Sequence, residues 1–406
     1  MTRVLMVYPQ FRVLGGAEIV ALHLLRWLLT RPGVEVTLLT LHPVDLEELQ
    51  RNSGILFNGT SVRVVEAFCP AFVRDADQSM TILKLAFLHR HAKRISREYV
   101  LCITPYGEED FGVRGVQLIH HPTFVSKRFL HRFKMTGNTT ILDRWLILAE
   151  LYRGLIYAIS GNRPSGYRRN LTIPSTEFIR GVLEEAYGIT GEVLYPAVLP
   201  DNEPPETNPW EKREFLIVAL GRLAPDKNYL RLLELFRAIH IQFPESQFVI
   251  IGRIGNSAYA EMLQRKVSES GLPVRFVTGA SNEEVREYLS RARFLLHAKE
   301  FEHFGIALVE AANYGCLPLA HDSGGAPEIL PSILLRYRTE DELVRNLARI
   351  CTNDALRRAI QNELREGLVR FRLPAFEAGL DRLLTPFLAV DPDPQEAVER
   401  TMMGRT

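Results

Sequence analysis

The chain has 406 residues, of which 46% are hydrophobic and 24% charged, and its formal net charge is +1. This length predicts two or three domains, and the composition excludes intrinsic disorder and argues against a nucleic-acid partner. Four widely separated cysteines predict neither a disulfide framework nor a zinc module. Because no apolar run is long enough to span a membrane, we expect a cytoplasmic protein, at most peripheral on the cytoplasmic membrane face.

The first half of the chain alternates between strand and helix patterns. A short apolar run at 4–8 is followed by a glycine-containing loop, a helical pattern at 17–29 and a β-branched run at 34–40. This order predicts a βαβ unit and therefore a parallel sheet. We expect the alternation to continue through three further apolar runs, at 100–103, 116–119 and 156–160.

The second half repeats this pattern. Strands are predicted at 215–220, 247–251, 274–277, 294–297 and 317–320, with helices at 229–241, 259–270, 283–291 and from about 306. After Asp322 the pattern predicts only helices, at 339–351, 353–368 and 374–388, and then a polar tail from 391 to 406. The sequence therefore predicts two doubly wound α/β domains in tandem.

A proline-rich segment separates the two halves. Residues 196–210 contain five prolines and no hydrophobic period, which is typical of a linker between domains. The halves also differ in charge, because residues 1–195 contain 23 basic and 18 acidic side chains, whereas residues 196–406 contain 26 and 30. We expect the two halves to face different partners.

The strongest motif is EHFGIALVE, residues 302–310. Gly305 stands just before an apolar helix, so the backbone N–H groups around Phe304, Gly305 and Ile306 are unpaired donors that favour an anion. Glu302 and Glu310 flank these donors, and carboxylates accept hydrogen bonds from sugar hydroxyl groups. On this chemistry a ligand with both phosphate and sugar fits the segment, while an ordinary glutamate-rich helix start remains an equal alternative.

The same residues resemble a known family. Glu302 and Glu310 match the E-x7-E signature of retaining GT-B glycosyltransferases of the family-4 type (glycosyl transferases group 1), and LLHAKEFEHFGIALVEAANYGCLPLAHDSGGAPEIL resembles that family throughout. The EHFGI sequence at 302–306, together with HHPT at 120–123 and LYPAV at 194–198, is most similar to the sequences of mannosyltransferases that extend lipid-linked oligosaccharides.

The resemblance implies a GT-B fold, in which two Rossmann-like domains face a cleft. We expect an acceptor-side domain at 1–195, a linker at 196–210, a donor domain at 211–375 and a helix at 376–390 that returns to the first domain. A second motif, GRLAPDKN at 221–228, follows a predicted strand. The family places diphosphate-binding cations here, so Arg222 and Lys227 are expected to stabilise the leaving nucleoside diphosphate without a metal or other cofactor.

Further predicted site residues lie at other strand ends. Gly15 and Gly16 permit positive φ and a close approach to the donor diphosphate, although a tight turn explains them equally well. The resemblance places a sugar-positioning histidine at His120 rather than His121, and makes Glu302, Arg222, Lys227 and His120 the catalytic set. The predicted donor-binding residues also include Phe304, Gly305, Ile306, Glu310, and four glycines at other loops: Gly252, Gly279, Gly324 and Gly325.

The expected reaction is transfer of a hexose with retention, mannose from GDP-mannose, onto a glycan or lipid-linked acceptor. The alternatives are a UDP-sugar-dependent glucosyl, galactosyl or N-acetylhexosaminyl transferase, a nonenzymatic nucleotide-sugar-binding protein and, on an incomplete glycine fingerprint, an NAD-dependent oxidoreductase. Residues 84–134 contain ten basic and four acidic side chains interleaved with Phe and Leu. This pattern suits contact with an anionic membrane, although solvated helix faces explain it equally well.

Overall fold

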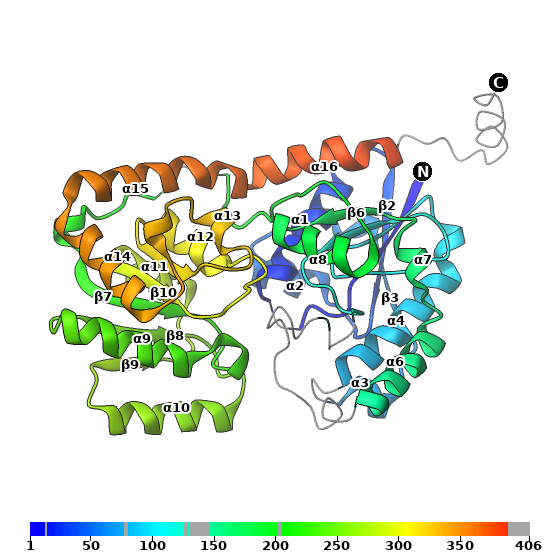
Figure 1. Ribbon diagram of the computed structural model, residues 1–406. Helices are drawn as coiled ribbons and strands as arrows, with labels where there is room; N and C mark the ends of the chain where they lie inside the picture. The colour runs from blue at the N-terminus through cyan, green and yellow to red at the C-terminus, as the bar shows by residue number, and fades with distance from the viewer. Residues whose placement is uncertain (13, 77–79, 126–128, 130–145, 202–204, 389–406) are drawn as a thin grey trace. The chain divides into compact units, whose positions relative to one another are not determined.

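The computed structural model describes residues 1–406 except 13, 77–79, 126–128, 130–145, 202–204 and 389–406 (Figure 1). The predicted tail at 391–406 lies outside the described residues. The chain divides into two compact units, the first made of residues 1–119, 152–173 and 377–406 and the second of residues 120–151 and 174–376.

The first unit contains a parallel six-stranded sheet in the order β3-β2-β1-β4-β5-β6. Its central strand is apolar and fully buried from Val4 to Val7, because helices cover both faces of a parallel sheet. The strands are β1 Thr2–Val7, β2 Val34–Thr40, β3 Val62–Glu66, β4 Leu101–Thr104, β5 Val116–Ile119 and β6 Leu171–Pro174. The helices up to α8 are α1 Gly16–Leu29, α2 Leu46–Ser53, α3 Ala71–Arg74, α4 Thr81–Ile95, α6 Leu146–Ser160, α7 Pro164–Tyr167 and α8 Glu177–Tyr187.

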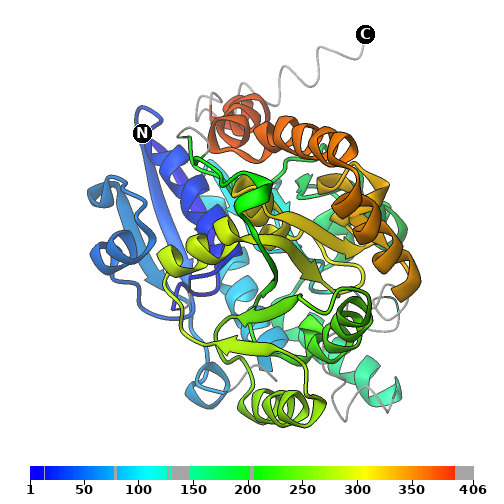
Figure 2. The same ribbon diagram turned by 90° about the vertical axis from the view of Figure 1, so that its left-hand side faces the viewer.

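The second unit repeats this topology with a parallel sheet in the order β12-β11-β10-β7-β8-β9. Figures 1 and 2 show this sheet as one layer with helices on both sides. Its strands are β7 Glu214–Leu220, β8 Gln247–Ile251, β9 Val274–Val277, β10 Ala292–His297, β11 Leu317–His321 and β12 Arg336–Tyr337. Its helices are α9 Tyr229–Gln242, α10 Ser257–Ser270, α11 Asn282–Arg291, α12 Ile306–Asn313, α13 Ala326–Ile329, α14 Glu340–Thr352 and α15 Asp354–Gly367, followed by α16 Leu373–Leu388.

The last helix, α16, begins in the second unit, and from residue 377 onward it belongs to the first. Arg26 of α1 donates to the Glu377 carboxylate at 2.6 Å, and the Trp27 indole N–H donates to Asp381 at 2.9 Å. These contacts show that the end of α16 packs against α1, as the family resemblance implies.

Two predicted elements are wrong. Residues 156–160 were expected in the strand alternation, but they lie in α6, because a run of five apolar residues does not distinguish strand from buried helix. The region after Asp322 is not only helical, since β12 adds a strand to the second sheet. This strand has two residues, which is too short for a periodic pattern.

The compact units also differ from the predicted domain boundaries, because residues 174–195 pack with the second unit. The Glu328 carboxylate accepts hydrogen bonds from the backbone N–H groups of Glu177 at 2.8 Å and Phe178 at 2.9 Å. These are otherwise unpaired donors in the first turn of α8. The predicted linker at 196–210 also lies within the second unit, where Leu199 bonds to the Phe371 carbonyl and Trp210 is buried.

Candidate functional site

A buried carboxylate, Glu302, lies at the carboxyl ends of the neighbouring strands β7 and β10. Its Oε2 is 3.1 Å from Lys227 Nζ and 3.1 Å from His297 Nε2, and its Oε1 is 3.1 Å from Lys299 Nζ. The backbone N–H of His303 also donates to Oε1, at 3.1 Å. The strand order reverses between β7 and β10, and ligands of open α/β sheets bind at such a switch point.

The electrostatics of this Glu302 cluster favour an ionised carboxylate. Burial alone would raise the pKa of Glu302, but the cations Lys227 and Lys299, with the His297 hydrogen bond, hold that pKa well below its usual range. Burial lowers the pKa of His297, so its imidazole is neutral and donates Nε2–H. Two ammonium groups against one carboxylate leave a net positive charge, which favours an anionic ligand.

Glycines shape the loop that carries Glu302. Gly305 has φ +105° and immediately precedes α12. Gly324 has φ +64°, and a Cβ there would lie 2.4 Å from the Glu302 carbonyl oxygen, so only glycine allows this approach. The Gly325 N–H donates to the same oxygen at 2.7 Å. Gly324 and Gly325, predicted to bind the donor, therefore pack beneath the Glu302 loop.

Other aromatic and apolar residues of the motif support the helix. Phe304 is buried, and its ring packs edge-on against Phe371 with centroids 5.3 Å apart. Ile306 is the first residue of α12 and is partly buried. The side chain of Phe304 thus anchors the turn, which leaves its backbone as the part of the residue that could contact a ligand.

The two predicted cations have different surroundings. Lys227 pairs with Glu302, whereas the Arg222 side chain is 53% exposed and lies 3.8 Å from Asp226. A Cβ on Gly252 would lie 1.8 Å from the Gly221 carbonyl oxygen, so this glycine lets the loop before Arg222 pack closely on β8. The structure therefore gives Gly252 a packing role and leaves the Arg222 guanidinium facing solvent.

Glu310 lies one turn along α12 from Ile306 and lines a pocket of about 480 Å³. The pocket is bounded by Asn282, Val285 and Leu289 of α11 and by Val198 and Pro200. Burial raises the pKa of Glu310 to about 7, and Arg286 lowers it only in part. This carboxyl group therefore has an adjoining space that a ligand could fill.

The neighbouring histidines His120 and His121 differ in their contacts. The Nδ1 of His121 lies 3.2 Å from Nε2 of His303, and the ring centroids are 4.5 Å apart. Burial lowers the pKa of His121 to about 4, so this is a hydrogen bond between neutral rings. His120 is adjacent, but its buried Nε2 has no described partner. His121 is therefore the histidine that contacts the residue following Glu302, while the role predicted for His120 stays a prediction.

The remaining predicted glycines lie in two turns. Gly15 precedes α1 with φ −131°, and its N–H donates to Glu18 at 3.0 Å. The positive φ that glycine permits is used at neither Gly15 nor Gly16, because the Glu18 carboxylate stabilises an extended backbone at Gly15 and Gly16 begins α1. Gly279 does have positive φ, +79°, in the turn between β9 and α11.

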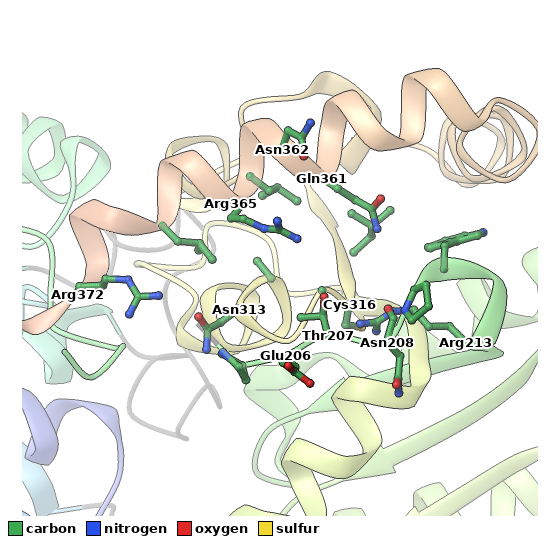
Figure 3. A pocket seen from close by; sticks show the side chains of 18 residues that line it. Glu206, Thr207, Asn208, Arg213, Asn313, Cys316, Gln361, Asn362, Arg365 and Arg372 are labelled. Atoms are coloured by element: carbon green, nitrogen blue, oxygen red, sulfur yellow. The ribbon is translucent and has the colours of Figure 1, made fainter. Parts of the chain in front are cut away.

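A further pocket of about 410 Å³ lies between α15, the end of α12 and residues 205–213 (Figure 3). Arg213, Asn313 and Arg365 point toward it, and it contains none of the predicted site residues. Two residues of the Glu302 cluster, His297 and Lys299, were also missed by the sequence analysis. A lysine three residues before a glutamate in a loop is too common a pattern to have identified them.

The basic segment 84–134 is only partly described, since residues 126–128 and 130–134 lie outside the described residues. Within α4, Lys93 donates to Asp110 at 2.6 Å and Arg90 to the Ile159 carbonyl at 3.1 Å. These basic groups hold the first unit together. Among the described residues, no helix has both the length and the apolarity that a membrane span requires.

The second unit matches a family model. Residues 201–366 match the family model described as glycosyl transferases group 1. A similar protein is the phosphatidylinositol N-acetylglucosaminyltransferase gpi3 subunit of Schizosaccharomyces pombe, 31% identical over 40% of this chain and 36% of that one. Another is the GDP-Man:Man(3)GlcNAc(2)-PP-Dol alpha-1,2-mannosyltransferase of Xenopus laevis, 32% identical over 28% and 25%. The matches thus span about a third or less of these relatives.

Solved structures resemble nearly the whole chain. HepE of Anabaena in complex with UDP superposes with a TM-score of 0.65 at 15% identity, covering 95% of this chain and 100% of that one. Sucrose-phosphate synthase of Thermosynechococcus elongatus gives 0.65 at 16% identity, covering 96% and 100%. These likenesses, with the two six-stranded parallel sheets, confirm the predicted GT-B fold.

Proposed function

We propose that this chain, whose residues 201–366 match glycosyl transferases group 1 and which has a GT-B fold, is a retaining hexosyltransferase that uses a nucleotide sugar. The observation that carries this proposal is the Glu302 cluster, an ionised carboxylate held between Lys227 and Lys299 at the switch point of the second sheet. In this proposal Glu302 and the N–H groups near Gly305 bind the donor sugar and diphosphate, and Glu310 binds the ribose hydroxyls.

In the proposed reaction, bond formation and bond cleavage at the anomeric carbon take place on the same face of the donor sugar. The acceptor hydroxyl attacks from the side where the diphosphate leaves, and its proton passes to the departing phosphate oxygen. Lys227 exchanges its contact with Glu302 for the diphosphate, where it and Arg222 stabilise the developing charge in the place of a metal. Four donors already bind the two oxygens of Glu302, which supports a binding role over covalent attack.

The donor we favour is GDP-mannose, and the acceptor a glycan, free or lipid-linked. Support comes from the Xenopus laevis relative, whose name specifies GDP-Man and a PP-Dol-linked acceptor. A second candidate is N-acetylglucosaminyl transfer from a UDP-sugar, because the Schizosaccharomyces pombe relative carries that name and a structural neighbour was solved with UDP-glucose. His121 and His303 are proposed to lie beside the transferred sugar.

A donor screen tests the proposal. Thermal denaturation of wild-type protein is measured with GDP-mannose, UDP-glucose, UDP-N-acetylglucosamine or NAD. In a separate assay, hydrolysis of each sugar nucleotide by the folded protein is followed. A ligand at a hundred times its dissociation constant adds roughly 2.7 kcal/mol to the free energy of unfolding. Stabilisation and hydrolysis with GDP-mannose support mannosyl transfer, whereas a response to UDP-sugars alone selects the second candidate. No response to any sugar nucleotide contradicts the proposed function.

A further inference from the structure

The first unit has its own pocket, of about 280 Å³, at the carboxyl ends of β1 and β2. Tyr8 follows β1, and Leu41 and His42 follow β2. The opposite wall comes from the end of α3 and the start of α4, including Arg74 and Lys84. We call this the first-unit pocket.

Three cations line the first-unit pocket: Arg12, Arg74 and Lys84. Burial is the main cause that lowers the pKa of His42, and the charges of Arg12, Arg74 and Lys84 lower it further. The three cations therefore act on the same imidazole ring, which is neutral. Lys84 donates to the Ala76 carbonyl at 2.6 Å, which leaves further N–H donors on its ammonium group. Arg12 is exposed and makes no ion pair with a described residue.

The two acids of the first-unit pocket are already bound. Glu18 accepts from the Tyr8 hydroxyl at 3.0 Å and from the Gly15 N–H at 3.0 Å. Asp75 pairs with Arg74 Nε at 3.1 Å. With three cations, two such acids and a neutral histidine, the pocket keeps a net positive charge and has donors that suit a small anion.

Two exposed aromatic side chains lie close in sequence to Arg74, one of the cations of the first-unit pocket. Phe68 and Phe72 are each 75% exposed, and Phe72 shares the single turn of α3 with Arg74. The free energy falls when an apolar surface covers large exposed rings, because their apolar area is then removed from water. One of the three cations, Arg74, and two exposed aromatic rings therefore lie on one short stretch of chain, residues 68–74.

We propose that the first-unit pocket binds the phosphate or diphosphate group of a lipid-linked acceptor, with Phe68 and Phe72 against the lipid. This inference rests on the proposed function and specifies its acceptor. It places the lipid contact at Phe68 and Phe72, upstream of the basic segment at 84–134. The occupant is anionic because the cations of the pocket outnumber its acids, and it is lipid-borne because two exposed aromatic rings lie within six residues of Arg74 in the chain.

The first experiment measures binding of inorganic pyrophosphate to the full chain by calorimetry, with GDP and UDP present in saturating amounts to occupy the donor site. We expect Arg12→Gln, Arg74→Gln and Lys84→Gln each to weaken binding about tenfold, as for loss of one charge-assisted hydrogen bond. Arg94→Gln is the matched control, because Arg94 is an exposed cation on α4 outside the pocket. Equal pyrophosphate affinity in all four variants and wild type overturns the pocket assignment.

A second experiment separates a lipid-borne phosphate from a free one. Wild-type protein is sedimented with phosphatidylcholine vesicles that contain or lack phosphatidic acid. We expect binding only with phosphatidic acid, and its loss in Phe68→Ser/Phe72→Ser with pyrophosphate affinity unchanged. Ile241→Ser is the control, since Ile241 is 77% exposed on α9. Unchanged vesicle binding in the double variant overturns the lipid assignment. The proposed function fails separately, when wild-type protein shows no response to any sugar nucleotide. Pyrophosphate binding does not depend on that result, so the two failures can be told apart.

Discussion

The two acids of one motif, eight residues apart, have opposite environments. Glu302 is ionised, buried and bound by four donors, whereas Glu310 borders a pocket and its pKa is raised to about 7. Both environments follow from the position of each acid relative to α12. Glu302 precedes this helix, at the switch point, whereas Glu310 lies within it and lines a pocket with residues of α11. A shared sequence signature therefore holds two chemically different carboxyl groups, which suits binding at two ends of one ligand.

The largest effect is expected from Glu302→Gln. This change removes the charge that orders Lys227 and Lys299, and we expect the transfer rate to fall by about 10²–10³, the usual loss for one preorganised electrostatic group. Glu283→Gln on the exposed face of α11 is the control and should retain full activity. Thermal denaturation checks that the variant is folded, and wild-type turnover in folded Glu302→Gln would contradict the role of this acid.

A pair of lysine variants sharpens the comparison at Glu302. Lys227→Met and Lys299→Met each remove one ammonium group from the same carboxylate. If Lys227 also binds the diphosphate, Lys227→Met should lower affinity for a nucleoside diphosphate about tenfold or more, and Lys299→Met by less. Calorimetry with GDP and UDP measures the difference. Equal losses in the two variants would limit Lys227 to positioning Glu302.

The Glu310 environment predicts a pH dependence. Burial favours the protonated acid in the free protein, but ribose hydroxyls that donate to Glu310 favour its ionised form. Donor affinity should therefore fall as the pH drops below about 7, by at most about tenfold per pH unit. His121 does not interfere, because its pKa is about 4.

The measurement uses GDP-mannose or the UDP-sugar that the donor screen selects, because a sugar nucleotide has no phosphate that titrates near pH 7. Calorimetric titrations between pH 6 and about 8 are run on wild type and Glu310→Gln. The variant should bind more weakly at the upper end and show a flat profile. A wild-type profile that is equally flat would remove Glu310 from the ribose site.

The smallest effect is expected from chelation. If Arg222, Lys227 and the N–H groups at the start of α12 neutralise the departing diphosphate, EDTA should leave the transfer rate unchanged. The rate is measured with and without added Mg²⁺ or Mn²⁺ after exhaustive dialysis against chelator. A rate that is lost on chelation and restored by either ion would show that the protein cations are insufficient.

The sequence predicted most of the second sheet and the approximate positions of Glu302, Lys227 and Glu310, because parallel strands end at one edge and carry their motifs there. It missed His297 and Lys299, whose roles depend on side chains converging in space. It assigned the sugar-positioning role to His120, which stays a prediction, and it could not show the contact between His121 and His303, because that contact joins residues far apart in the sequence. Gly324 and Gly325 were assigned to the ligand, although their tight packing beneath Glu302 appears only in three dimensions.

The most direct test of the division between the two acids compares a sugar nucleotide with its bare nucleotide. Calorimetry is run at pH 8 with GDP-mannose and GDP, or with the corresponding UDP pair, on wild type, Glu302→Gln and Glu310→Gln. We predict that Glu302→Gln loses the extra affinity contributed by the sugar, while Glu310→Gln weakens both ligands equally. Equal weakening of both ligands by Glu302→Gln, with unchanged nucleotide affinity in Glu310→Gln, would contradict this assignment.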